Sequence, residues 1–187
     1  ASVVYNRDVL FFMLCAMLAI GVWVRCRNPL LRAMSLSAAG AVLCLGVLGD
    51  VFTALFPKLA FFQSAVTKYG VIHTATAWQP KRWLSFLLLL YVLAACVVGL
   101  YGAIGHSRRA YFAIAVLCAG FSTRAMLGFS PTVWQSGART GFFFACACVY
   151  CCAQVWGSLA GCRRARLACG GCIALGAVWG CVQMIGA

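Results

Sequence analysis

Acidic residues are almost absent from this sequence. Asp8 and Asp50 are the two that it contains, against fifteen lysines and arginines, which gives a formal net charge of +13. Charged residues of both signs make up 9% of the chain, whereas a typical soluble domain carries about 25%. This shortage excludes an ordinary soluble domain, and it excludes an active site built on paired carboxylates.

Other chemical signatures are missing as well. The sequence has no P-loop, no glycine-rich dinucleotide-binding turn and no Ser/His/Asp set. Its two histidines are isolated from each other, since His73 falls in a long polar connection and His106 lies beside Arg108 and Arg109. We therefore predict no cofactor.

Cysteine is abundant, with thirteen residues. Most of them lie inside apolar runs, as Cys15, Cys44 and Cys96 do, and a buried thiol there acts as a small hydrophobic group. Cys169 and Cys172 form one C-x-x-C pair, but structural zinc requires four ligands and no second pair or histidine lies near. We predict no metal site, with metal or redox use as the minor alternative.

Long apolar runs dominate what is present. Hydrophobic residues make up 65% of the chain, its mean hydropathy is +0.98, and a helix needs about 20 such residues to cross a bilayer. We predict an all-α fold, a polytopic transmembrane helix bundle that forms a single domain over residues 1–187. Whether this is a whole protein or the C-terminal part of a longer one stays open. The six predicted spans cover residues 9–24, 33–56, 83–105, 110–129, 141–161 and 167–186.

Eight of the fifteen basic residues lie in the short first, third and fifth connections between these spans, while the long second connection carries four more, Lys58, Lys68, Lys81 and Arg82, which weakens the contrast. Nucleic-acid binding would explain such a charge in a soluble protein, but beside membrane spans the positive-inside rule orients these connections to the cytoplasm. We predict a multi-pass protein of the bacterial inner membrane with lipids, and no nucleic acid, as partners. The 57–82 and 130–140 loops then face outside. The eight arginines are Arg25, Arg27, Arg32, Arg108, Arg109, Arg163, Arg164 and Arg166.

The longest connection, residues 57–82, has a helical pattern of its own, which predicts a short helix in the membrane interface. A plain connector is the alternative. Trp78 and Trp83 mark the headgroup level, and we predict that His73 and Trp78 belong to the wall of an outward-facing groove. The apolar residues at helical spacing are Leu59, Phe62, Val66 and Tyr69.

The stretch "SPTVWQSGART", residues 130–140, separates two apolar runs and holds no acid. Arg139 lies near its end, and Arg124 interrupts the apolar run before it. Two unpaired guanidinium groups near hydrocarbon are costly unless an anion binds them, and phosphate matches the guanidinium fork. Snorkelling of Arg124 to the membrane edge is the alternative. The predicted lipid-phosphate site consists of Arg124, Ser130, Thr132, Ser136, Arg139 and Thr140, with Trp134 against the lipid tail or a sugar face.

Residues 123–140, "TRAMLGFSPTVWQSGART", resemble a signature of a family of uncharacterised bacterial polytopic membrane proteins. That family is similar to GT-C glycosyltransferases. The resemblance implies a multi-span enzyme that holds a polyprenyl-phosphate-linked sugar donor at the extracytoplasmic face and transfers the sugar to a cell-envelope acceptor. The matching residues are Arg124, Gly128, Phe129, Ser130, Pro131, Thr132, Ser136, Gly137, Arg139 and Thr140.

The chain departs from the GT-C pattern in its acids. GT-C enzymes use an acidic residue in an early extracytoplasmic loop, and Asp8 and Asp50 are the weak catalytic candidates here. Two other functions stay open: a non-enzymatic transporter of lipid or small anions, and an assembly subunit without a ligand. The spacings Gly157-x-x-x-Gly161 and Gly176-x-x-x-Gly180 would suit a helix-packing partner.

Overall fold

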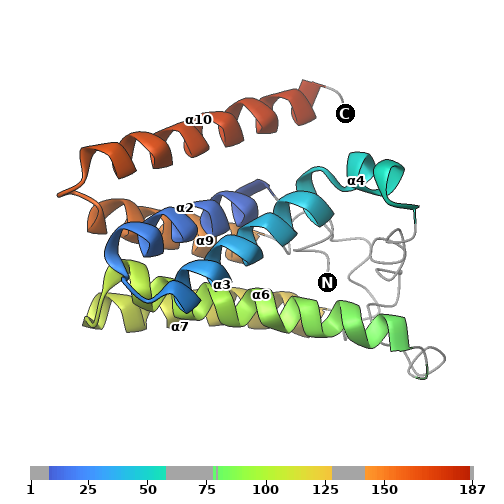
Figure 1. Ribbon diagram of the computed structural model, residues 1–187, viewed down its shortest axis with the longest axis horizontal. Coiled ribbons are helices and arrows are strands. Elements are labelled where there is room, and N and C mark those ends of the chain that lie inside the picture. The colour runs from blue at the N-terminus through green and yellow to red at the C-terminus, as the bar shows by residue number, and fades with distance from the viewer. Residues whose placement is uncertain (1–8, 58–77, 79, 128–141, 186–187) are drawn as a thin grey trace.

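The computed structural model describes residues 9–57, 78, 80–127 and 142–185, and their regular secondary structure is entirely helical (Figure 1). This confirms the all-α prediction for the described part of the chain. The helices are α2 (Val9–Arg25), α3 (Pro29–Val42), the π-helical η1 (Leu43–Val47), α4 (Gly49–Leu55), α6 (Pro80–Ile104), α7 (Arg108–Leu127), α9 (Phe142–Ser158) and α10 (Arg163–Ile185).

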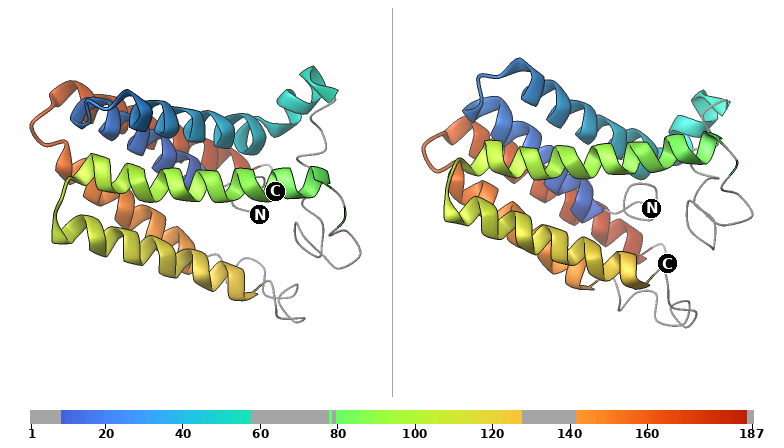
Figure 2. Two further views of the ribbon diagram at one scale, coloured as in Figure 1. Left: turned by 60° about the horizontal axis from the view of Figure 1, so that its bottom comes forward. Right: turned by 90° about the horizontal axis from the view of Figure 1, so that it is seen from below.

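The long helices run up and down in chain order, and both further views agree on this arrangement (Figure 2). The turns at residues 26–28, 105–107 and 159–162 gather at one end of the bundle, which we name the arginine end. The other end, which we name the distal end, holds the starts of α2, α6 and α9 and the ends of α7 and α10. Helix α4 also lies there.

Helix α2 is the centre of the bundle, since it contacts α3, α6, α9 and α10. Its fully buried side chains include Phe11, Met17 and Val22. Near the distal end, the Phe11 ring lies 5.8 Å from both the Phe121 ring of α7 and the Phe144 ring of α9, measured between centroids. These three rings join the first, fourth and fifth long helices into one core.

Small residues allow two pairs of helices to approach closely. A Cβ atom at Gly21 would lie 2.7 Å from the Cβ of Ala103, and one at Gly120 would lie 2.9 Å from the Cβ of Ala147. Van der Waals packing of small residues is a main source of helix association in lipid. By contrast, Gly157 and Gly161, predicted to serve helix packing, have no heavy atom within 4 Å of a Cβ placed there. Gly176 faces the side chain of Met13.

Polar residues fix the turns at the arginine end. Asn28 caps α3 by accepting a 3.0 Å hydrogen bond from the Leu30 amide, and Pro29 begins the helix. Helix α6 stops at Gly105, whose φ of +87° is a left-handed value that favours glycine. Its amide closes the last turn on the Tyr101 carbonyl at 3.0 Å. Ser107 then accepts a bond from the Ala110 amide at the start of α7.

The predicted span 33–56 is not one straight helix. It begins at Pro29, widens to a π-helix over Leu43–Val47, and restarts as α4. The Leu48 amide donates to the Leu43 carbonyl at 2.8 Å, five residues back, which accommodates the extra residue in the turn. Residues 33–56 contain no proline, so nothing in the sequence predicted this break.

The other helix boundaries agree with the predicted spans to within a few residues. The interfacial helix predicted in the 57–82 loop falls mostly on residues 58–77, which lie outside the described residues.

Two helices in the described part of the chain are long and apolar enough to cross a membrane, Pro29–Val47 and Trp83–Ile104. Val9–Arg25 and Phe142–Ser158 are apolar but shorter. The six-span bundle therefore remains a prediction.

Candidate functional site

Arg124 lies in the last turn of α7, and its side chain is outside the described part of the structure. Asp50 lies in the first turn of α4, also with its side chain undescribed, and Trp78 is 93% exposed. The structure therefore gives Arg124 and Asp50 a backbone position at the distal end and leaves their contacts untested. The other predicted site residues lie outside the described residues: Asp8, His73, Ser130, Thr132, Trp134, Ser136, Arg139 and Thr140.

What the structure does describe is the helix pair that leads to this loop. Helices α7 and α9 pack against each other through Gly120 and Ala147, and the Phe121 and Phe144 rings lie 4.7 Å apart. Because α7 runs toward the distal end and α9 runs away from it, the two helix ends that bracket residues 128–141 lie side by side (Figure 2). The geometry thus holds the two ends of the predicted lipid-phosphate loop close together.

An apolar groove of about 360 Å³ follows the surface between these two helices. From Val116 to Thr123 it spans about 10 Å along α7, at 1.5 Å per residue. Thr123 is its lining residue on α7 nearest the distal end, and Thr123 directly precedes Arg124 in the sequence. The lining residues are Val116, Ala119, Gly120, Thr123, Phe143, Cys146, Ala147 and Tyr150.

The polar groups of α7 beside the groove are satisfied within the helix. The Thr123 hydroxyl donates to the Gly120 carbonyl at 2.7 Å, and the Ser122 hydroxyl donates to the Cys118 carbonyl at 2.9 Å. Such bonds back to the preceding turn spare a hydroxyl from seeking a partner outside the helix. At the end of the groove nearer the arginine end, the Tyr150 ring packs edge-on against the Phe112 ring with centroids 5.7 Å apart. The groove therefore presents carbon and sulfur to whatever fills it.

No feature singled out in the sequence predicted this groove. Its α7 wall is the set Val116, Ala119, Gly120 and Thr123, in which residues of modest size recur every three or four positions. That spacing would have indicated one helix face of low relief. It could not have indicated that α9 supplies the opposite wall.

The arginine end holds its cations in a different way. The Nη1 atom of Arg25 donates to the carbonyl oxygens of Ala103 at 3.4 Å and Ile104 at 3.0 Å. These are among the last carbonyls of α6, which have no partner within the helix, so a cation is favoured there. The guanidinium of Arg32 lies 5.0 Å from the centroid of the Trp23 ring, and its Nε donates to the Cys26 carbonyl at 2.7 Å.

Five cysteines lie buried in the core, among them Cys15, Cys96 and Cys151, whereas Cys118, Cys146 and Cys181 are exposed. The Sγ atoms of Cys15 and Cys96 lie 3.7 Å apart, and the Cys151 thiol donates to the Ala113 carbonyl at 3.5 Å. Cys169 and Cys172, the C-x-x-C pair, are free thiols. Within the described ranges, no group of three or more His, Cys, Asp or Glu residues is arranged to hold a metal ion.

Comparisons with protein-family models, with curated proteins and with solved structures gave no match for this chain. The candidate site therefore rests on the sequence and the geometry of the bundle.

Proposed function

We propose that this chain is a six-span protein of the bacterial inner membrane that binds a polyprenyl-phosphate lipid at its distal end. The observation that best supports this proposal is the apolar groove between α7 and α9. Its last lining residue on α7, Thr123, directly precedes Arg124. A lipid with a long hydrocarbon tail and a phosphate head requires these two features side by side. The tail lies in the groove, and Arg124 and Arg139 bind the phosphate.

Insertion in a membrane is supported by the surface of the bundle. Large apolar side chains are exposed along its length, among them Leu36, Leu87, Phe112, Val149 and Leu175. So many large apolar side chains on the surface are unusual in water and ordinary in lipid.

The positions of aromatic residues on α6 support the same conclusion. Trp83 and Tyr101 are both partly exposed, near the two ends of that helix. The rise between them is about 27 Å at 1.5 Å per residue, close to the hydrocarbon thickness of a bilayer, about 30 Å. Aromatic residues are enriched at both interfaces of a membrane.

The resemblance to GT-C glycosyltransferases extends the proposal to sugar transfer. In that reaction a carboxylate takes the proton of an acceptor hydroxyl, the acceptor oxygen bonds to the sugar C1, and the bond from C1 to the phosphate oxygen breaks. Arg124 and Arg139 would stabilise the departing lipid phosphate through charge-assisted hydrogen bonds. Asp50 lies in the first turn of α4 at the distal end, and it and Asp8 are the candidate bases.

A binding measurement tests the lipid-phosphate site. The purified full chain in detergent is titrated with a polyprenyl phosphate and with the matching neutral polyprenol. Charge-assisted hydrogen bonds contribute roughly 1.5–3 kcal/mol, so Arg124→Ala and Arg139→Ala should each weaken phosphate binding about 10- to 150-fold. Arg→Lys should restore part of the affinity, since a point charge lacks the bidentate fork.

The matched control is Arg108→Ala, which removes the same charge from the arginine end. It should leave polyprenyl-phosphate binding unchanged. If Arg124→Ala and Arg139→Ala both keep the preference for phosphate over the alcohol, the proposed site is wrong and snorkelling accounts for Arg124.

A further inference from the structure

A second pocket lies at the arginine end, opposite the proposed carrier-lipid site. Its volume is about 500 Å³, within the range of small-ligand sites. It is formed where the end of α2, the α6–α7 turn and the α9–α10 turn meet. The lining residues are Arg25, Ile104, Ser107, Arg109, Gln154, Gly157, Ser158, Ala160 and Gly161.

Two guanidinium groups from different elements line this pocket. Arg25 is held in place by its bonds to the Ala103 and Ile104 carbonyls, so the α6 backbone fixes its planar fork. Arg109 comes from the first turn of α7 and is exposed. A pocket with two arginines, one of them preorganised, favours a ligand with at least two anionic or strongly accepting oxygens.

Polar side chains between the arginines add donors. Ser107 accepts the Ala110 amide through its Oγ at 3.4 Å, which leaves the hydroxyl proton for a ligand. Gln154 lines the pocket from α9, and its side-chain amide makes no hydrogen bond to another described residue. Ser158 uses its proton internally, since its Oγ lies 2.6 Å from the Val155 carbonyl and 3.1 Å from that of Ala103. Ser107 also precedes α7, whose N-terminal dipole favours an anion.

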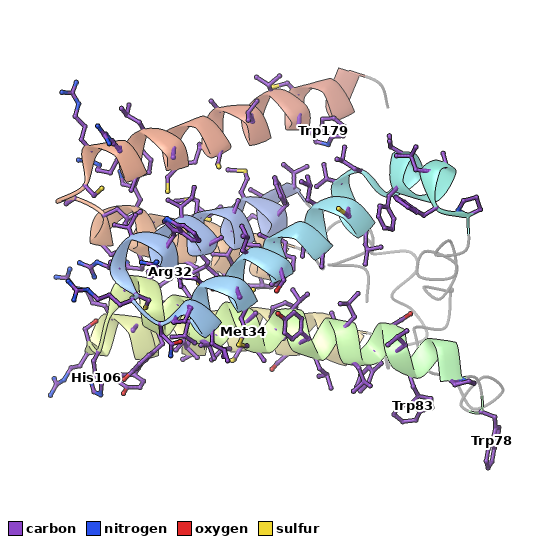
Figure 3. All side chains as sticks on the ribbon, viewed as in Figure 1. Arg32, Met34, Trp78, Trp83, His106 and Trp179 are labelled. Carbon is purple, nitrogen blue, oxygen red and sulfur yellow. The ribbon has the colours of Figure 1, made fainter. Side chains whose placement is uncertain are left out.

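Acid that would neutralise this pocket is scarce. The chain contains two acidic residues, Asp8 and Asp50, and Asp50 lies in α4 at the distal end. Arg32 and His106 mark the arginine end, with Trp83 and Trp78 near the other end (Figure 3). The positive charge of the pocket therefore favours an anionic ligand that is not part of the described chain.

The aromatic residues near the pocket indicate which kind of ligand it would bind. Aromatic residues surround the arginine end: the guanidinium of Arg166 lies 5.3 Å from the centroid of the Trp156 ring, and Tyr101 and Tyr111 pack with centroids 6.2 Å apart. Tryptophan and tyrosine gather at the headgroup level of a bilayer, and basic pockets between helices on the cytoplasmic side bind lipid phosphates.

We infer that this pocket binds the phosphate of an anionic phospholipid headgroup in the leaflet opposite the carrier lipid. The inference rests on the proposed membrane insertion and orientation, and it is independent of the polyprenyl-phosphate site. Arg25 and Arg109 hold the phosphate oxygens, and Ser107 and Gln154 donate to the remaining acceptors.

Two neighbouring arginines give a matched test. Arg109 lines the pocket and Arg108 does not, although both begin α7 and carry the same charge. The full chain in detergent is titrated with short-chain phosphatidylglycerol and with phosphatidylcholine, and bound lipid is counted by native mass spectrometry. Arg109→Gln should weaken phosphatidylglycerol binding about 10-fold or more, and Arg108→Gln should leave it nearly unchanged.

Three results would overturn the inference. If both variants lose the same affinity, the attraction comes from diffuse charge and not from a pocket; if neither loses affinity, the pocket is not a phosphate site. Glycerol phosphate and inorganic phosphate form a further arm. If either compound competes as strongly as the lipid does, the ligand of the pocket is a soluble phosphate compound and not a phospholipid. In the same samples, Arg109→Gln should retain polyprenyl-phosphate binding, which separates a failure here from a failure of the distal site.

Discussion

The two ends of the bundle support their arginines in different ways. At the arginine end, guanidinium groups lie on backbone carbonyls and aromatic rings, as Arg25 does on Ala103 and Ile104 and Arg32 does on Trp23. At the distal end, Arg124 follows an apolar groove in which the neighbouring hydroxyl of Thr123 is already bonded to its own helix. The first arrangement holds cations on the fold itself, although Arg25 still lines the pocket proposed for a phospholipid headgroup, and the second places Arg124 beside the groove proposed for a lipid tail.

The contrast is between charge that the helix ends themselves stabilise and charge that the proposed carrier lipid would stabilise. Eight arginines share the arginine end, where short turns and helix C-termini offer many acceptors. Variants that change one end at a time test this contrast.

Filling the distal groove should have the largest effect. Ala119→Trp places a large ring in the groove beside Gly120, so the lipid tail loses its contacts. In detergent the tail gains packing contacts rather than escape from water, and at about 0.1–0.2 kcal/mol for each atom pair the loss of about twenty contacts should weaken polyprenyl-phosphate binding about 100-fold.

Cys118→Trp is the control for this variant, since Cys118 is exposed on α7 and does not line the groove. Titration with the same lipid compares the two. If both variants bind the lipid with equal affinity, the groove does not hold the lipid tail.

Loosening the α7–α9 contact should have the next largest effect. Gly120→Ala brings a Cβ to 2.9 Å from the Ala147 Cβ and 3.3 Å from the Phe144 Cα, so backbone must move. Overpacking of this kind costs about 1–3 kcal/mol. Gly171→Ala on α10, where no heavy atom lies within 4 Å, should lose no stability. Unfolding in denaturing detergent measures both, and a Gly120→Ala protein as stable as Gly171→Ala would contradict the packing described here.

Removing a cap at the arginine end should have the smallest effect. Arg25→Ala removes the side-chain donor to the Ile104 carbonyl and one of the two side-chain donors to the Ala103 carbonyl, and water can partly replace it because Arg25 is exposed. We expect a loss of about 1 kcal/mol. Arg27→Ala removes the same charge from a residue that makes no hydrogen bond within the described residues, and it should cost less. The same unfolding assay decides, and an equal loss would show that charge and not capping matters.

Hydropathy predicted the helices well because each apolar run ends where the chain turns. Arg25 to Asn28, Gly105 to Ser107 and the residues before Arg163 all carry turn or charge signals in the sequence. The π-helix at Leu43–Val47 carried no such signal, since its residues are as apolar as their neighbours. Local composition fixes where a helix ends, and it does not fix how the hydrogen bonds shift within one.

The sites were less predictable than the helices. Arg124 stood out because a cation within an apolar run is costly. The groove beside it and the pocket around Arg25 and Arg109 arise from helices far apart in sequence. No periodicity in one segment states which other segment will face it, so these features needed the packed bundle.

The central claim is that the two ends of the bundle lie on opposite sides of a membrane. The direct test is reaction of single cysteines with an impermeant thiol reagent in intact cells, in a background without the native cysteines. Ser64→Cys and Ser136→Cys, at positions outside the described residues, should react from outside. Ala160→Cys, in the exposed α9–α10 turn, should react only after lysis. Labelling of the Ala160→Cys variant in intact cells, or of the Ser136→Cys variant only after lysis, would contradict the account.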